Sequence, residues 1–156
     1  MTPGTLRRLI NFWPPFLGAG IRVRRIAPDW SEAEVELRAR FYNRNYVGTH
    51  FGGSLYAMAD PFFMLMLMHQ LGGRYLVWDR AAHIDFVAPG RGTVRARFEM
   101  PEARVAEIRE QAAAGEKILP EFEVRLIDAD GALVATVRKV IYVRLKPRFR
   151  PEGEAA

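Results

Sequence analysis

Hydrophobic residues are densest in residues 54–71, where Asp60 is the only charged side chain. A surface helix of a soluble domain has an apolar stripe, whereas this stretch is apolar on every side. A membrane span needs about 20 apolar residues, and this stretch is shorter and is interrupted by Asp60 and Pro61. We therefore expect a central helix wrapped by a sheet, with one carboxylate inside. Glycine pairs bound the stretch: Gly52 and Gly53 before it, Gly72 and Gly73 after it.

Alternation of apolar and polar residues predicts strands in the rest of the chain. Residues 128–131 read Asp-Ala-Asp-Gly, which indicates a hairpin between the last two strands. Helical spacing predicts a short amphipathic N-terminal helix within residues 1–15 and a surface helix near 102–114. The six predicted strands are residues 20–25, 33–41, 74–87, 93–98, 121–127 and 133–145.

These elements predict an α+β fold in which a curved antiparallel sheet of about six strands wraps one long central helix. A sheet of this size covers only part of a helix that is apolar all round. A second copy of the protein is the economical cover for the remainder, so we expect a homodimer or a dimer of dimers.

The composition fits one domain, residues 1–156, because 49% of the residues are hydrophobic and 12% are aromatic. The absence of cysteine excludes disulfides, thiolate zinc sites and a cysteine nucleophile. With no apparent signal peptide or transmembrane segment, we expect a cytoplasmic protein. The net charge of +5 suits an anionic partner such as a phosphate-bearing ligand. Residues 146–156 are interpreted as a basic, flexible tail.

The central stretch and the loop before it resemble hotdog-fold proteins of the thioesterase superfamily, including the phenylacetate-pathway acyl-CoA thioesterases. In that pattern an asparagine precedes a His-Gly-Gly loop, and an aspartate follows the second glycine by seven positions. The resemblance is strongest to a branch with a Gly-Thr-His-Phe-Gly-Gly-Ser loop, here residues 48–54, and it covers about residues 22–144. One departure is that Phe51 stands where many relatives have histidine, which displaces His50 by one position. The matching positions are Asn45, Gly52, Gly53 and Asp60.

The glycine pair would bring a free backbone N–H at the helix start close to a ligand, where it could stabilise the negative charge of a thioester oxygen under attack. Asp60 lies seven residues after Gly53, about 10 Å further along an ideal helix. One reacting carbon can hardly touch both groups. The spacing therefore predicts a site shared across a dimer, with Asp60 of one chain, as nucleophile or general base, facing the Gly53 amide of another. Alternatively, Asp60 and Pro61 only cap a second helical segment.

Other residues of this region are secondary candidates. His50 orients the acyl group or water, or is a structural residue of the loop. Asn45 positions water or, more simply, holds the loop. Ser54 is a potential nucleophile, but it lacks a nucleophile-elbow setting, and a serine at a helix start is usually a cap. The residues predicted to contact substrate are Gly52, Phe51, Ser54, Met64, Arg80 and Arg91. Of these, the two arginines are expected to bind the phosphates of coenzyme A.

The leading hypothesis is an acyl-CoA thioesterase that needs no cofactor beyond the coenzyme A of its substrate. The principal alternative is a non-catalytic hotdog module that binds acyl-CoA or another lipid. A hydratase would require a histidine and a carboxylate poised together, and His50 and Asp60 are poorly spaced for that. No metal site is expected, since His69 and His83 are scattered, and the basic residues form no nucleic-acid recognition element.

Overall fold

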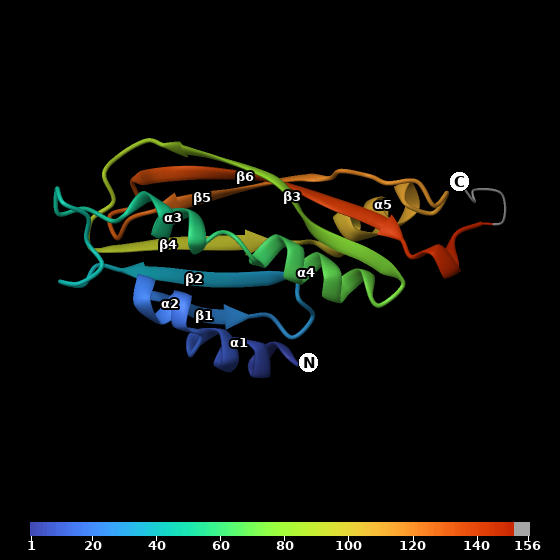
Figure 1. Cartoon of the computed structure of the whole chain (residues 1–156), viewed down its shortest axis with the longest axis horizontal. Coiled ribbons are helices and arrows are strands. Elements are labelled where there is room, and N and C mark those ends of the chain that lie inside the picture. Colours follow the sequence, from blue (N-terminus) through green and yellow to red (C-terminus); the bar gives the residue numbers. More distant parts are fainter. Residues whose placement is uncertain (152–156) are drawn as a thin grey trace.

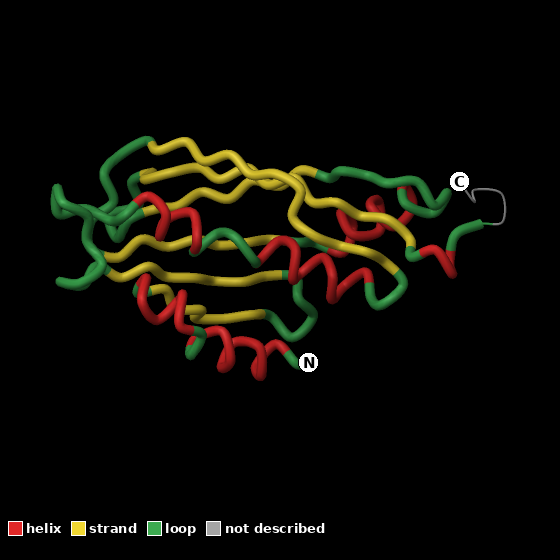
Figure 2. Tube along the Cα trace, in the orientation of Figure 1, coloured by secondary structure: helices red, strands yellow, loops and turns green. Residues whose placement is uncertain are grey.

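In a computed structural model, which describes residues 1–151, the chain forms one six-stranded antiparallel sheet in the order β1-β2-β4-β5-β6-β3. The helices α3 and α4 cross one face of this sheet (Figures 1 and 2). This is the predicted hotdog arrangement. The strands are β1 (Ile21–Ile26), β2 (Glu32–Arg38), β3 (Tyr75–Phe86), β4 (Thr93–Glu99), β5 (Glu121–Ile127) and β6 (Leu133–Leu145), and the helices are α1 (Pro3–Asn11), α2 (Pro14–Ala19), α3 (Gly52–Ala57), α4 (Phe62–Leu71) and α5 (Glu102–Gln111).

All six predicted strands are confirmed, with shifts of one to three residues at some ends. The short N-terminal helix predicted within residues 1–15 is confirmed as α1. A second helix, α2, was not predicted; it begins at Pro14 and Pro15, because proline is favoured in the first turn of a helix. The predicted surface helix is α5, which buries Val105 and Ile108.

The predicted C-terminal tail begins at Lys146, whose backbone N–H donates to the carbonyl oxygen of Arg74. Pro147–Phe149 then form a short 3-10 turn, and the side chain of Arg150 donates to the carbonyl oxygen of Leu145. Residues 152–156 of the tail lie outside the described part of the chain.

The central helix is present, but it is interrupted between α3 and α4. Pro61 has no N–H to donate to Ala57, and residues before a proline avoid helical geometry. The backbone here forms hydrogen bonds of the 3-10 type, in which each N–H donates to the carbonyl oxygen three residues before it. The N–H of Ala59 donates to Tyr56, and the N–H of Asp60 donates to Ala57. Residues 58–61 therefore form a turn in which Asp60 leaves the helical ladder.

Aromatic rings join the central helix to the sheet. The ring of Phe98 on β4 lies 4.9 Å from Phe62 and 5.2 Å from Phe63 between centroids, and Phe16 of α2 packs on Phe62 at 6.3 Å. All four side chains are buried. Burying one such side chain contributes roughly 1.5–3 kcal/mol, so this cluster fixes α4 on the sheet and thereby the position of the turn before it.

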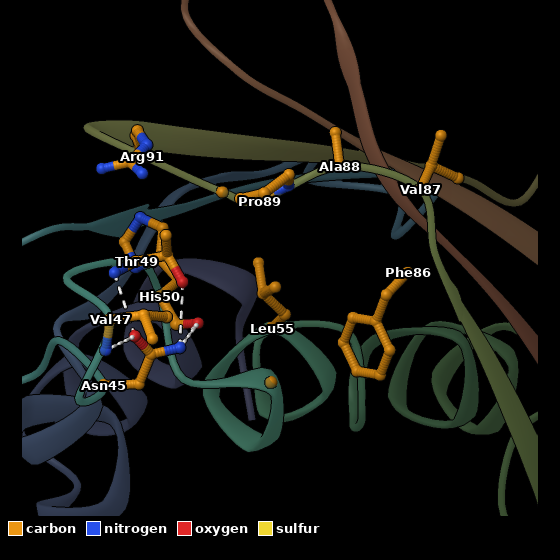
Figure 3. A pocket seen from close by; sticks show the side chains of 12 residues that line it. Asn45, Val47, Thr49, His50, Leu55, Phe86, Val87, Ala88, Pro89 and Arg91 are labelled. Carbon is orange, nitrogen blue, oxygen red and sulfur yellow. Dashed lines mark hydrogen bonds between the residues drawn. The ribbon is translucent and has the colours of Figure 1, made fainter.

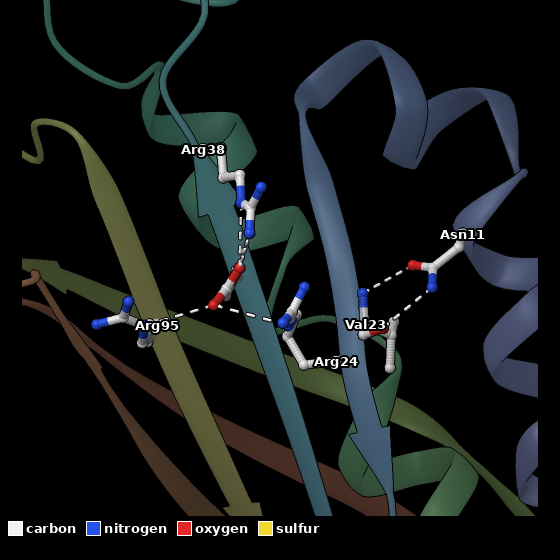
Figure 4. Close-up of polar contacts among 6 residues, drawn as sticks. Asn11, Val23, Arg24, Arg38 and Arg95 are labelled. Atoms are coloured by element: carbon white, nitrogen blue, oxygen red, sulfur yellow. Dashed lines mark hydrogen bonds and ion pairs between the residues drawn. The ribbon is translucent and has the colours of Figure 1, made fainter.

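The two edges of the sheet differ. Along β1, the side chain of Asn11 accepts a hydrogen bond from the N–H of Val23 at 2.7 Å and donates to its carbonyl oxygen at 3.0 Å (Figure 4). Asn11 thus occupies backbone groups that a further strand would use, and α1 and α2 lie along this edge (Figure 1). At the opposite edge, β3 pairs only with β6 within residues 1–151. One edge is covered and the other is open.

The outer face of the sheet carries a mixed-charge cluster centred on Glu36 of β2. Its carboxylate lies 2.9 Å from Arg38, 3.5 Å from Arg95 and 3.8 Å from Arg24 (Figure 4). Although burial opposes ionisation, hydrogen bonds from Arg38 and the neighbouring positive charges hold the pKa of Glu36 below its usual value. This cluster lies on strands and joins β1, β2 and β4.

Candidate functional site

A cavity of about 520 Å³ opens where the loop before α3 meets the chain after β3. Pro89, Ala88 and Val87 line one wall, and Leu55 and Phe86 line the wall across from it (Figure 3). The loop residues stand at one end. The cavity is lined by Asn45, Val47, Thr49, His50, Gly52, Leu55, Phe86, Val87, Ala88, Pro89, Gly90 and Arg91.

Asn45 organises the loop at this end of the cavity. Its Oδ1 accepts hydrogen bonds from the backbone N–H groups of Thr49 (3.0 Å) and Val47 (3.2 Å). Its Nδ2 donates to the Thr49 hydroxyl at 2.9 Å and to the His50 carbonyl oxygen at 3.2 Å (Figure 3). Every polar atom of this amide is used within the loop. These contacts support the structural interpretation of Asn45.

His50 is buried, with 3% of its surface exposed. Its Nε2 lies 3.0 Å from the carbonyl oxygen of Gly92, and because a carbonyl only accepts, Nε2 carries the proton. Burial lowers the pKa of His50, so the ring is neutral at neutral pH. Its Nδ1 is buried and has no hydrogen-bond partner among the described residues. His50 ties the loop before α3 to the loop after β3.

The glycine pair begins α3, and each glycine leaves room for an aromatic ring. A Cβ on Gly52 would meet the ring of Phe86 at 3.0 Å, and one on Gly53 would collide with the ring of Phe51. Within residues 1–151 the N–H groups of Gly52 and Gly53 donate no hydrogen bond. Two backbone donors are therefore free at the start of α3, and one of them belongs to Gly52, which lines the cavity.

Asp60 does not cap the second helical segment. The N-cap of α4 is Pro61, with no side-chain cap hydrogen bond. The Asp60 carboxylate instead turns toward β6, where its Oδ1 accepts from the Tyr56 hydroxyl at 2.8 Å and from Nζ of Lys139 at 2.8 Å. The capping alternative was wrong, and so was the expectation of a carboxylate enclosed within the chain, because 48% of the Asp60 side chain is exposed.

Lys139 is the partner that the sequence patterns did not single out. Its side chain is completely buried, and besides Asp60 it donates to the Tyr56 hydroxyl oxygen at 3.2 Å. Its Nζ also forms an ion pair with Oδ1 of Asp79 on β3, at 3.0 Å. We call Tyr56, Asp60, Asp79 and Lys139 the Lys139 cluster.

The electrostatics of the Lys139 cluster follow from burial and pairing. Burial lowers the pKa of Lys139, but its bonds to Asp60 and Asp79 outweigh this and leave the pKa above its usual value. Burial raises the pKa of Asp79, although Lys139 opposes the shift. Burial and the hydrogen bond to Asp60 raise the pKa of Tyr56, so the phenol stays protonated and donates. The cluster therefore holds a permanent cation between two acids.

A strand pattern could have flagged Lys139. It stands between Val137 and Ile141, both fully buried, so alternation along β6 assigns it to the core face. A lysine in such a position is almost never fully buried unless it is paired. The identity of its partners could not be derived, because Asp60 and Asp79 come from distant parts of the sequence.

The structure groups only some of the predicted site residues. Asn45, His50, Gly52 and Arg91 line the cavity, whereas Asp60 is not among its described lining residues. Ser54 is buried in α3 and is not its N-cap, which is Phe51, so the capping expectation was wrong. The other candidates are exposed or packed away from the cavity: Phe51 and Arg80 are exposed, and Met64 packs against the core.

A family comparison places the chain. Residues 5–143 match a family described as a domain of unknown function, DUF4442. The chain belongs to this family. No curated protein matches this DUF4442 sequence. Among residues 1–151, no helix is long and apolar enough to cross a membrane.

Solved structures share the fold of this DUF4442 domain. A Pseudomonas aeruginosa protein of unknown function, described as a probable thioesterase, superposes with a TM-score of 0.83 at 18% identity, over 94% of this chain and 97% of that one. A Haemophilus influenzae thioesterase superposes with a TM-score of 0.67 at 15% identity, over 93% of this chain and 92% of that one. The E. coli PaaI protein from the phenylacetic acid degradation operon superposes with a TM-score of 0.59 at 16% identity, over 92% of this chain and 91% of that one. These likenesses establish the hotdog fold of the chain.

Proposed function

We propose that this protein is an acyl-CoA thioesterase in which Asp60 activates water. The observation that carries the proposal is the state of the Asp60 carboxylate: Oδ1 is held by Tyr56 and Lys139, while Oδ2 has no hydrogen-bond partner in the described chain. The side chain is about half exposed. An anchored carboxylate with one open oxygen can take a proton from a water molecule placed beside it. The thioesterase descriptions of the structural relatives favour the same chemistry.

The proposed reaction is a hydrolysis with Asp60 as general base. Oδ2 accepts a proton from water as the water oxygen bonds to the thioester carbonyl carbon. Negative charge moves onto the carbonyl oxygen, where a free backbone N–H stabilises it. When the carbon–sulfur bond breaks, the thiolate leaves and Asp60 returns the proton to it. The products are a carboxylic acid and a free thiol.

The open edge of β3 supports a site shared between two chains. Unpaired backbone groups on an exposed edge strand are a template for another strand. Asp79 lies on this strand and belongs to the Lys139 cluster, so a second copy that pairs along β3 approaches Asp60. We propose that it supplies the Gly53 N–H as the oxyanion donor. The cavity beside Gly52 then receives part of the substrate, with Arg91 at its rim for a phosphate of coenzyme A.

Thiol release from a panel of acyl-CoA chain lengths tests the activity, and Asp60→Asn tests the base. Asparagine keeps the size and the acceptor oxygen of Asp60 but cannot take the proton, so we expect a loss of about 10²- to 10⁴-fold in kcat. Asp130→Asn, in an exposed turn, is the matched control and should keep wild-type activity. An Asp60→Asn variant with wild-type kcat would refute the assignment.

Mixed dimers of two variants test whether the active site is shared between two chains. Gly53→Pro removes the proposed donor, and prolines are tolerated at the start of a helix, as Pro14 and Pro15 show in α2. This substitution is combined with Phe51→Ala, because side-chain atoms at position 53 would otherwise collide with the Phe51 ring. The control is Gly53→Ala combined with Phe51→Ala, which keeps the backbone N–H at position 53. Mixing the proline variant with Asp60→Asn should restore about a quarter of wild-type activity, because half of the twofold dimers then hold one intact site. No recovery would place both groups in one chain.

A second candidate is a non-catalytic module that binds acyl-CoA or another lipid. Its support is His50, which is buried, neutral and bonded to Gly92, and so is occupied in holding loops together. The same protein preparation separates the two: saturable binding of acyl-CoA without thiol release at any chain length favours the binding module.

A further inference from the structure

We propose that Lys139, Tyr56 and Asp79 are positioning residues for Asp60: they fix Oδ1, leave Oδ2 as the working oxygen, and balance the charge of the site. This inference rests on the proposed role of Asp60 and names the machinery that makes Asp60 competent. The first argument is geometric, because two donors at 2.8 Å converge on one oxygen of the carboxylate.

The donors that hold Asp60 are themselves fixed. Lys139 projects from the middle of β6, between β5 and β3, and its side chain is completely buried. Tyr56 is one helical turn before Asp60, and its hydroxyl accepts from Lys139 while donating to Asp60. A carboxylate held by two rigid donors keeps a single orientation. That constraint matters here because residues 58–61 form a turn outside the regular α-helical hydrogen-bond ladder.

Asp79 supplies the charge balance. Lys139 alone would neutralise Asp60 and make it a poor proton acceptor. Asp79 shares the ammonium at 3.0 Å, so the charged groups that face Asp60 are one cation from β6 and one acid from β3, with the neutral Tyr56 from α3. With both acids ionised the cluster has a net charge of −1. Asp60 is thereby oriented by a cation without being fully paired by it.

The charge arrangement predicts opposite effects for two variants. Lys139→Met removes the cation beside Asp60, so ionised Asp60 is less stable and the acid limb of kcat/KM moves to higher pH. Asp79→Asn removes the competing negative charge, so the acid limb moves to lower pH. Because Asp60 is half exposed, we expect each displacement to be about one pH unit. Lys139→Met should also lower kcat by about tenfold through lost orientation, with a smaller change in KM.

The experiment records pH profiles of thiol release for the wild type, Lys139→Met, Asp79→Asn and Tyr56→Phe. Arg138→Met is the control, since Arg138 is the neighbour of Lys139 on β6 but is exposed and pairs with Asp85. Its acid limb should coincide with that of the wild type. Opposite displacements in the two charge variants support the proposal. Coincident profiles, or displacements in the same direction, overturn it.

A second readout is independent of catalysis. Carbon NMR of selectively labelled aspartate follows the titration of the Asp60 carboxyl carbon in each folded variant, with the peak assigned from Asp60→Asn. The same opposite displacements are expected. If the wild type releases no thiol but the NMR midpoints move oppositely, the proposed hydrolysis fails and the charge coupling stands. If the wild type is active and the midpoints do not move, the positioning proposal fails alone.

Discussion

Removal of the buried ammonium should destabilise the fold measurably. In Lys139→Met the side chain remains long and apolar, but Asp60 and Asp79 lose their cation. Removing one partner of a buried ion pair costs about 3–5 kcal/mol. The Asp60 and Asp79 side chains are 48% and 28% exposed, so water replaces part of the lost contact. We therefore expect a loss of about 2–3 kcal/mol, at or just below the lower end of that range.

Urea unfolding followed by tryptophan fluorescence measures this loss, and thermal unfolding should give a Tm lower by about 4–12 °C for a chain of this size. Arg138→Met is again the control: its pair with Asp85 is exposed, so its loss should stay within about 0.5 kcal/mol. Lys139→Met/Asp79→Asn should recover part of the stability, because it removes the buried charge left without a cation.

The pH dependence has a definite sign. Burial raises the pKa of Asp79, and a carboxyl group with a raised pKa stabilises the folded protein at low pH and loses that contribution as the pH rises through its folded-state pKa. The difference between Lys139→Met and the wild type should therefore be largest near neutral pH. It should shrink in mild acid as Asp79 becomes neutral. A loss no larger than that of Arg138→Met, or one that is independent of pH, would refute this account.

Two further substitutions address the loops. Asn43→Ala should lower the free energy of unfolding by about 2–3 kcal/mol in urea titrations, because this buried amide bonds three backbone groups at 2.6–2.8 Å and their loss leaves those groups unsatisfied. Arg91→Ala should raise KM for acyl-CoA about tenfold, the loss of one charge-assisted contact, while KM for a short thioester without phosphates stays unchanged. Equal effects on both thioesters would remove Arg91 from phosphate binding.

The strands and the apolar central stretch could be predicted because both are local patterns. Alternation along residues 133–145 fixes the faces of β6, and the glycine pair at 72–73 ends α4, where Gly72 adopts a positive φ of 79°. The break at Pro61 was visible in the sequence as a proline within an apolar run, but its effect on Asp60 was not. Whether a carboxylate caps a helix or reaches a strand depends on what lies opposite.

The candidate site could be predicted only in part, because local spacing marks single residues but not their partners in the fold. Asn45, Gly52 and Asp60 could be marked by spacing, and the structure places the first two around one cavity. The Lys139 cluster draws on α3, the turn after it, β3 and β6, and no periodicity links these segments. Tertiary pairing decides which inward lysine meets which acid.

Asn11 has a consequence for how many copies can join. Edge-to-edge addition of identical chains becomes an endless ribbon when each chain offers two open sides. Here the β1 side is already closed by the chain's own N-terminal helix, so a second molecule docking on β3 uses the one remaining side of each partner. Assembly by strand addition then stops at a dimer. Loss of the Asn11 hydrogen bonds to β1 would expose a second edge and allow the chains to polymerise.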